Sequence, residues 1–398
     1  MTEEKRQRAW EHYWQSSRLA SCGGEGGQQY QDAIVEHWHR VFANFHGVDQ
    51  LLDLCCGNGA LALMANRYFR EQGLGSVAIT GIDQARINPQ RWLARLNPWI
   101  TPIRFMGGVP AESLPFPEGS FSAVIGQYAI EYTDRDRSLA ECQRVLADSG
   151  YLAFVCHARE GCTVQRAQTQ LADVGRLGRL DYFSAARELA RLQFSRRDPG
   201  HPDCLAAKTV FEEKSQILRD WASRAAEPAM YENIVNVTTD TLRKSIHHPP
   251  EVIQAKLDEV AAGVENHAHR VRALVQAALT DTEIRSWLDP LIRRNFRAVG
   301  RLPQPVQGPR GLLGWSVVLR RGHYDPLEFS WIPFCGPLIQ GTKPGRTNPP
   351  GFPRLDAWQR PTLTWRMPHT TIGAGRFHFR VRNGIGWFPS AQVTRQNE

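Results

Sequence analysis

The 398-residue sequence has no long apolar run of the kind that a membrane-spanning helix requires. Such a helix needs about 20 consecutive apolar residues, whereas LLDLCC at 51–56 and YLAFVC at 151–156 have the length of buried strands. The first residues, MTEEKRQRAW, lack the apolar core of a secretory signal. Eight irregularly spaced cysteines make no disulfide framework. We therefore expect a reduced, cytoplasmic protein without a membrane span.

Positive charge is concentrated toward the C-terminal end. The net charge is +8, but residues 323–398 hold nine Lys or Arg against four Asp or Glu, which leaves +3 for the rest. This segment also holds ten of the 25 prolines, and proline disfavours long helices and central strands because it lacks a backbone donor. We predict a weakly ordered, Pro/Gly-rich basic appendage over 323–398. Its four tryptophans leave open an RNA-binding interpretation.

Strands and helices alternate between residues 48 and 158, which is typical of parallel βαβ units. The predicted strands are 48–54, 77–82, 121–126 and 151–156, and the predicted helices are 60–70 and 135–146. This part would form the core of a doubly wound α/β fold. Residues 1–47 are predicted to be an N-terminal helical cap.

The pattern changes to helices alone over 159–279, where residues 253–278 carry an amphipathic stripe. This helical insert follows a strand that feeds the carboxyl edge of the sheet, the edge at which such folds bind ligands. We therefore expect the insert to act as a lid. Residues 280–322 complete the core with a helix, opened by the capping box of Thr280 and Glu283, and a β-hairpin around a Gly-Pro turn.

The strongest motif is LLDLCCGNG at 51–59, at the turn between the first strand and its helix. Gly57 and Gly59 permit backbone conformations and close approaches that a Cβ would forbid. The motif lacks the third glycine of the dinucleotide fingerprint and is not followed by the Gly-Lys-Ser/Thr of a P-loop. The next strand ends at Asp83, whose carboxylate could accept hydrogen bonds from both hydroxyls of a ribose.

These motifs resemble the class I S-adenosylmethionine-dependent methyltransferases, in the branch of small-molecule and quinone methyltransferases. LLDLCCGNG is similar to their first cofactor-binding motif and Gly81-Ile82-Asp83 to their ribose-binding acid. AESLPFPEGSFSAVIGQYAIEY at 111–132 resembles the adenine loop and fourth strand, and ECQRVLADSGYLAF at 141–154 the next helix and fifth strand. The resemblance implies a seven-stranded Rossmann-like sheet, S-adenosylmethionine as the cofactor, and a small organic methyl acceptor.

The resemblance also assigns cofactor contacts to individual residues. They are Asp53, Cys55, Gly57 and Gly59 for the methionine part, Asp83 for the ribose, Gln84, Ala111 and Glu112 for the adenine, and Gln127 for the sulfonium. Two positions depart from the family pattern, because Pro110 and Ser122 stand where acidic residues are common.

Methyl transfer from a sulfonium is an in-line displacement that needs alignment and exclusion of water, so a catalytic base is optional. Tyr128 and His157 follow the fourth and fifth strands and are the candidate catalytic residues. His157 could deprotonate a hydroxyl at neutral pH, or it could pack at the strand end. Trp10 and Trp14, with Tyr13, share one helical face that would either close the site or join the core.

Two other functions stay open beside the methyltransferase of small molecules. One is an RNA methyltransferase that uses the basic tail, although no Asn/Asp-Pro-Pro-aromatic motif follows the fourth strand. The other is a catalytically inactive methyltransferase-fold binding protein. No metal site is predicted, because the adjacent Cys55 and Cys56 have no second Cys/His pair at ligand spacing.

Overall fold

The chain divides into two units, residues 1–329 and 330–398. The computed structural model describes residues 3–15, 18–21, 30–73, 77–95, 97–225, 228–322, 380–381 and 384–385, with side chains between residues 7 and 322. In the second unit the described residues form two short antiparallel strands, β9 (Arg380–Val381) and β10 (Gly384–Ile385). The remainder of the predicted appendage lies outside the described residues.

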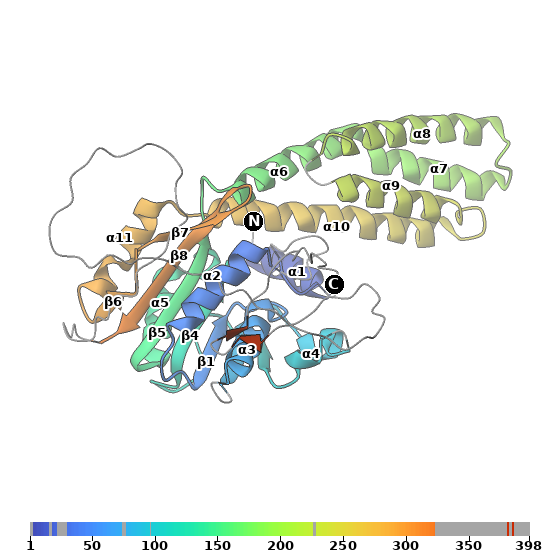
Figure 1. Ribbon diagram of the computed structural model, residues 1–398. Helices are drawn as coiled ribbons and strands as arrows, with labels where there is room; N and C mark the ends of the chain where they lie inside the picture. The colour runs from blue at the N-terminus through green and yellow to red at the C-terminus, as the bar shows by residue number, and fades with distance from the viewer. Residues whose placement is uncertain are drawn as a thin grey trace, which may run out of the picture. The chain divides into compact units, whose positions relative to one another are not determined.

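The main sheet of the first unit has the strand order β3-β2-β1-β4-β5-β8-β6 (Figure 1). Its strands are β1 (Gln50–Leu54), β2 (Ala78–Asp83), β3 (Arg104–Gly107), β4 (Phe121–Gln127), β5 (Leu146–His157), β6 (Phe296–Ala298) and β8 (Gly311–Arg321). The first five pair in parallel, while β8 runs antiparallel to β5 and β6. β7 (Gln304–Gly308) adds an eighth strand through a hairpin with β8, as the Gly-Pro turn predicted. The predicted doubly wound, seven-stranded sheet is thus confirmed, with one additional strand.

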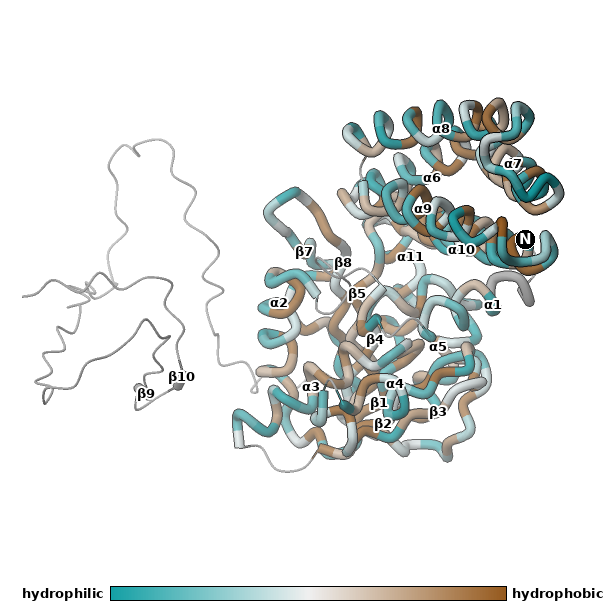
Figure 2. The backbone as a smooth tube through the Cα atoms, turned by 90° about the vertical axis from the view of Figure 1, so that its right-hand side faces the viewer, coloured by the Kyte–Doolittle hydropathy of each residue, from teal (hydrophilic) through white to brown (hydrophobic). Residues whose placement is uncertain are grey.

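Helices cover both faces of this sheet, so its parallel strands are apolar almost continuously. Leu51 belongs to the hydrophobic cluster on one face and Leu52 to the cluster on the other, because successive side chains of a strand point to opposite sides. Figure 2 shows the hydrophobic colouring of β1 and β2 between the helical layers. The helices on the first face are α2 (Asp32–Ala43) and α3 (Ala60–Glu71), with α4 (Pro89–Leu93) and η2 (Pro98–Ile100) beside them, and those on the second are α5 (Arg135–Val145) and α11 (Asp281–Ile292).

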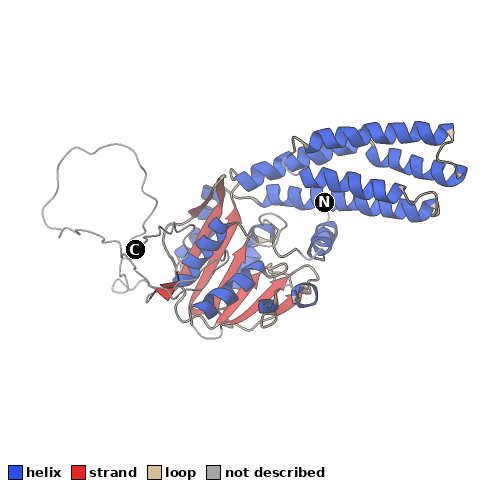
Figure 3. Ribbon diagram, turned by 45° about the vertical axis from the view of Figure 1, so that its right-hand side comes forward, coloured by secondary structure: helices blue, strands red, loops and turns tan. Residues whose placement is uncertain are grey.

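Residues 159–279 form a helical projection from the carboxyl edge of the sheet (Figures 1 and 3). Its helices are α6 (Cys162–Leu180), α7 (Tyr182–Arg196), α8 (Pro202–Ala222), α9 (Pro228–Leu242) and α10 (Pro250–Ala277). They enclose a hydrophobic core of their own, in which Tyr182, Tyr231 and Leu257 are buried. The projection therefore buries its apolar stripes without covering the sheet. Within the described ranges, no helix combines the length and apolar character needed to cross a bilayer.

The strand β3 is present although the sequence analysis did not predict it. This strand lies at the edge of the sheet with Arg104 and Gly107 exposed, and its sequence RFMG has no clear alternation of apolar and polar residues.

Ser122, at a position where an acidic residue is common, joins β4 to the start of β1. Its hydroxyl accepts hydrogen bonds from the N–H groups of Asp49 and Gln50, each at 3.0 Å, so a serine is sufficient for this connection.

The predicted capping box of α11 is present and can be tested. Thr280 Oγ1 accepts a hydrogen bond from Glu283 N–H at 3.2 Å, and Glu283 Oε2 accepts one from Thr280 N–H at 2.8 Å. We predict that Thr280→Ala lowers the free energy of unfolding by about 0.5–2 kcal/mol, because an N-terminal donor of the helix loses its partner. Thr209→Ala, on the exposed face of α8, is the control and should change stability little. Equal effects of the two variants in denaturant titrations would contradict this role of the box.

Candidate active site

Asp83, at the end of β2, holds the glycine turn that follows β1. Its Oδ2 accepts a hydrogen bond from Gly57 N–H at 2.8 Å, and its Oδ1 accepts one from Ala85 N–H at 2.8 Å. Gly57 and Gly59 have φ values of 53° and 81°, the left-handed region that glycine adopts without a steric cost. The carboxylate therefore connects the two strand ends that the sequence motifs had assigned to one ligand.

Two non-glycine residues in the same region also have left-handed backbones. Cys55 has φ 49° and Tyr128 has φ 53°. Such conformations cost about 1–3 kcal/mol and are concentrated at functional sites. The Tyr128 backbone is held by its N–H, which donates to Val155 O at 2.7 Å, and its side chain by its hydroxyl, which donates to Leu313 O at 3.0 Å.

The N-terminal helix α1 (Glu3–Trp14) lies against the glycine turn. A Cβ added to Gly57 would lie 2.3 Å from Cζ2 of Trp14, so glycine is required for this contact. Asn58, in the turn itself, donates from Nδ2 to the carbonyl oxygens of Trp14 at 2.8 Å and Arg18 at 2.7 Å. Tyr13 packs beneath Trp14, with ring centroids 4.9 Å apart. The aromatic face predicted for this helix therefore both packs and covers the site.

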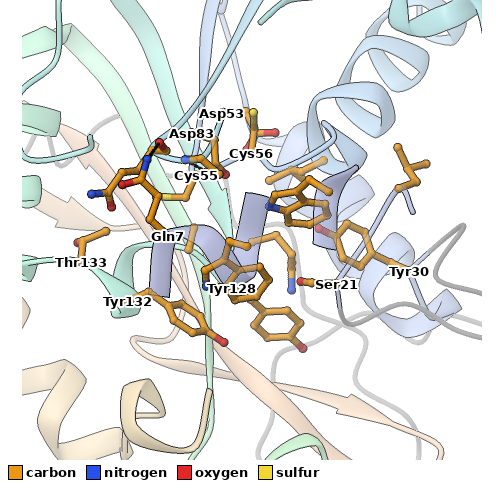
Figure 4. A pocket seen from close by; sticks show the side chains of 18 residues that line it. Gln7, Ser21, Tyr30, Asp53, Cys55, Cys56, Asp83, Tyr128, Tyr132 and Thr133 are labelled. Carbon is orange, nitrogen blue, oxygen red and sulfur yellow. Dashed lines mark hydrogen bonds between the residues drawn. The ribbon is translucent and has the colours of Figure 1, made fainter. Parts of the chain in front are cut away.

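A pocket lies where these elements meet at the carboxyl edge of the sheet (Figure 4). Its walls come from α1 and from the turns after β1, β2 and β4. They include Gln7, Trp10 and Trp14, then Asp53, Cys55 and Cys56, then Asp83, Gln84 and Ala85, then Gln127, Tyr128, Ala129, Tyr132 and Thr133. Figure 4 shows Asp53, Cys56 and Asp83 on one side of the pocket and Tyr128 and Tyr132 on the other.

Most of the residues expected from the sequence meet at this pocket. Those that line it are Asp53, Cys55, Asp83, Gln84, Gln127 and Tyr128. Gly57 and Gly59, expected at the methionine part, and Ala111 and Glu112, expected at the adenine, are not among its lining residues. The Ala111 side chain is buried in the hydrophobic cluster of the second face, and Glu112 Oε1 accepts a hydrogen bond from Asp134 N–H at 2.9 Å.

His157 does not lie on the pocket wall. Its ring is fully buried and stacks on Tyr128, with centroids 3.9 Å apart and planes at 5°. Burial lowers the pKa of His157 to about 3, so the imidazole is neutral at ordinary pH. This position does not support the general base expected from the sequence, because the proton to be abstracted must lie within hydrogen-bond reach. The ring instead supports Tyr128.

The insert does not provide the lid that we expected. No described residue of 159–279 is among those lining the pocket, and α1 provides the cover instead. The insert reaches the site through α10, on which α1 rests. The Arg270 guanidinium lies 4.5 Å from the centroid of the Tyr13 ring, and Arg270 Nη1 donates to Ala9 O at 3.4 Å. The helices of the projection pack on one another around a hydrophobic core of their own, which agrees with this arrangement.

Two buried carboxyl groups, Asp53 and Asp83, line the pocket, and a third, that of Glu131, lies outside its lining. Burial is the largest cause in each case, and it raises the pKa of Asp53 to about 8, of Glu131 to about 7 and of Asp83 to about 6. Burial also raises the pKa values of the Cys55 and Cys56 thiols, which therefore stay protonated. The described side chains include no group of three His, Cys, Asp or Glu that could hold a metal ion.

One buried contact at this site, between Trp38 and Gln127, was not predicted from the sequence. The indole N–H of Trp38, on α2, donates a hydrogen bond to Oε1 of Gln127 at the end of β4. Trp38 lies outside the recognised motifs and carries only the signal of an apolar helix face, which it shares with Ile34, Val41 and Phe42. That periodicity predicts burial but no polar partner.

Comparisons with known proteins show what this region is similar to. Residues 52–154 match the methyltransferase domain family. Malonyl-[acyl-carrier protein] O-methyltransferase of Geobacter sulfurreducens is 39% identical over 107 residues, 26% of this chain and 37% of that protein. Demethylmenaquinone methyltransferase of Symbiobacterium thermophilum is 30% identical over 125 residues, 30% of this chain and 48% of that protein. The chain thus spans less than half the length of these two relatives.

A solved structure, the YcgJ protein of Bacillus subtilis, is 25% identical and has a TM-score of 0.28, covering 32% of this chain and 52% of its own. The assignment of the fold rests on the strand order of this chain rather than on that likeness. The sheet order, the glycine turn held by Asp83 and the family match agree. Over residues 52–154 the chain is thus similar to the methyltransferase domain family.

The buried acid Asp53 makes a testable contribution to the pH dependence of stability. Its pKa is raised from 3.8 to about 8, so the folded state holds the proton more tightly than the unfolded state. Its stabilising contribution is therefore complete below about pH 4 and is lost as the pH rises through about 8. We predict that the free energy of unfolding falls less steeply between about pH 6 and 8.5 in Asp53→Asn than in the parent chain. The exposed control Glu71→Gln should keep the parent slope, and a parent slope in Asp53→Asn would contradict the protonated state.

Proposed function

We propose that this protein transfers a methyl group from S-adenosylmethionine to a small organic acceptor bound in the pocket under α1. The observation that carries the proposal is the composition of that pocket. One wall is formed by Cys55 and Cys56 of the turn after β1 and by Asp83, which holds that turn through Gly57 N–H. The opposite wall is formed by the residues that follow β4. A cofactor and an acceptor would meet between these walls, at the edge of the sheet where doubly wound folds bind ligands.

The residues of the first wall fit the proposed cofactor. Each oxygen of Asp83 accepts one backbone N–H, and a carboxylate oxygen has a second lone pair. One lone pair per oxygen therefore remains for the two hydroxyls of a ribose. When bound, S-adenosylmethionine supplies a methyl group on a positively charged sulfur. Asp53 and Cys55 would border its methionine part and Gln84 its adenine.

The opposite wall and the covering helix α1 favour an acceptor with apolar or aromatic character. Trp10, Trp14, Tyr128 and Tyr132 line the pocket, and Trp10 meets Trp14 and Tyr132 with ring centroids 5.9 and 6.0 Å apart. Such walls exclude water and align the reactants, which is most of what an in-line displacement requires. The two relatives act, by their names, on malonyl-[acyl-carrier protein] and on demethylmenaquinone. These names support an organic acceptor and leave its identity to experiment.

Asp83 provides the direct test of this proposal. We predict that Asp83→Ala weakens binding of S-adenosylhomocysteine at least about tenfold in calorimetric titrations, because a charge-assisted acceptor of two hydroxyls is lost. Asp148→Ala, an exposed residue in the β5 turn, is the control and should bind like the parent chain. Equal affinities of Asp83→Ala and the parent would reject the ribose assignment. A parent chain that does not bind the nucleoside would favour the inactive binding protein.

The same site should bind its cofactor in a pH-dependent manner. The pKa of Asp83 is raised from 3.8 to about 6, and the ribose hydroxyls donate to its ionised form. The affinity for S-adenosylhomocysteine should therefore fall as the pH is lowered through about 6, and Asp83→Asn should remove this dependence. If Asp83→Asn retains the parent pH profile, another group is responsible for it.

A further inference from the structure

The hydrogen bond from Trp38 fixes the orientation of the Gln127 side-chain amide. The indole Nε1 of Trp38 is a donor only, so the Gln127 atom that faces it must be the amide oxygen. The choice between oxygen and nitrogen, which is often ambiguous for a glutamine, is therefore set by chemistry. Consequently the other end of the amide, Nε2 with its two N–H groups, is the end left to interact elsewhere.

That nitrogen has no hydrogen-bond partner among the described residues. Gln127 lines the pocket and is only 7% exposed, so bulk water cannot satisfy both donors. A buried donor without a partner is unfavourable, and native proteins rarely leave one unsatisfied. The orphan amide is thus a buried, unpartnered donor of a residue that lines the pocket.

Trp38 is rigid enough to maintain this orientation. It is fully buried, and its ring packs against Phe42 with centroids 5.4 Å apart. The preceding residue, His37, is joined by a 2.8 Å hydrogen bond between its Nε2 and Ser316 Oγ on β8, which fixes α2 to the sheet. Rotating the Gln127 amide by half a turn would place two N–H groups against a third, so the tryptophan disfavours the alternative orientation.

We infer that Trp38 is a positioning residue for this site, which holds the Gln127 amide so that its N–H groups donate to an oxygen of a bound reactant. The inference rests on the proposed function. The bound reactant would therefore carry a hydrogen-bond acceptor oxygen next to the end of β4, and a hydrogen-bond donor at that place would be unfavourable. Two sources can provide this oxygen: the carboxylate of the cofactor's amino-acid part, or a carbonyl, carboxylate or phenol oxygen of the methyl acceptor.

The experiment compares two probes, of which only one has the carboxylate of the cofactor's amino-acid part. S-adenosylhomocysteine has the amino-acid carboxylate, and 5′-methylthioadenosine has the nucleoside and the sulfur without it. Gln127→Glu keeps an oxygen for Trp38 and removes both donors, and Gln127→Met removes the donors without adding charge. If the cofactor provides the oxygen, both variants should bind S-adenosylhomocysteine about tenfold or more weakly. Their affinity for 5′-methylthioadenosine should stay within about twofold of the parent.

If the acceptor provides the oxygen, both affinities should stay at the parent value. Transfer of tritium-labelled methyl from S-adenosylmethionine to a small-molecule extract should then fall about tenfold or more in both variants. Unchanged affinities with unchanged transfer would overturn the inference. Equal weakening of both probes would also overturn it, as would an effect confined to Gln127→Glu, because charge alone would then explain the result.

A double-mutant cycle tests Trp38 itself. Trp38→Phe should weaken the affected step, probe binding or methyl transfer, in the parent chain but not in Gln127→Met, because the tryptophan acts through the amide. Additive losses would assign Trp38 a merely structural role. If Trp38→Phe does not fold, the side-chain ¹⁵N–¹H signals of Gln127, identified by their loss in Gln127→Met, give a second measurement. If the cofactor provides the oxygen, these signals should shift when S-adenosylhomocysteine is added but not when 5′-methylthioadenosine is added. If the acceptor provides it, they should shift only when the small-molecule extract is added. The absence of a shift with all three would overturn the inference.

A parent chain that binds neither probe would instead contradict the proposed function. The two failures are distinguishable, because the inference is judged from differences between variants and parent. The proposed function is judged from the parent alone.

Discussion

The site depends on one carboxylate at the end of β2. Asp83 accepts the N–H groups of Gly57 and Ala85, and so it fixes the turn after β1 relative to the turn after β2. Without that acceptor two buried backbone donors would lose their partner, at a cost of about 1–3 kcal/mol each. The left-handed glycine turn, the approach of Trp14 and the pocket floor all follow from this connection. The same side chain would then serve a ligand with its remaining lone pairs.

A second constraint concerns how the pocket is covered. The cover is the short helix α1, and the long helix α10 of the insert supports it through Arg270 and Tyr13. Arg270 is largely desolvated, and burial lowers its pKa to about 10. The insert thus contributes to the site by supporting the cover, at the point where α10 returns to the sheet. Its distal helices α7, α8 and α9 pack on one another and on α10 away from the pocket.

The sequence was informative wherever a local pattern determines the structure. Apolar strands, the glycine turn, the acid at Asp83 and the capping box of Thr280 all depend on residues close together in the chain, and each lies where it was expected. The assignments that rest on long-range packing could not be obtained in this way. His157 follows the correct strand, but its ring turns into the core behind Tyr128. The Trp38 contact joins residues 89 positions apart, and nothing in the spacing of either residue indicates it.

Hydrogen exchange measured by mass spectrometry, on the full chain with and without S-adenosylhomocysteine, tests whether the sheet edge and α1 together form the cofactor pocket. We predict slower exchange on binding in four segments: 51–62 around the end of β1, 81–86 around the end of β2, 125–133 around the end of β4, and 7–14 in α1. We predict no change in 182–242, which lie in the distal part of the insert. Protection confined to the insert, or protection of the strand ends without α1, would contradict a pocket formed by the sheet edge and covered by the N-terminal helix.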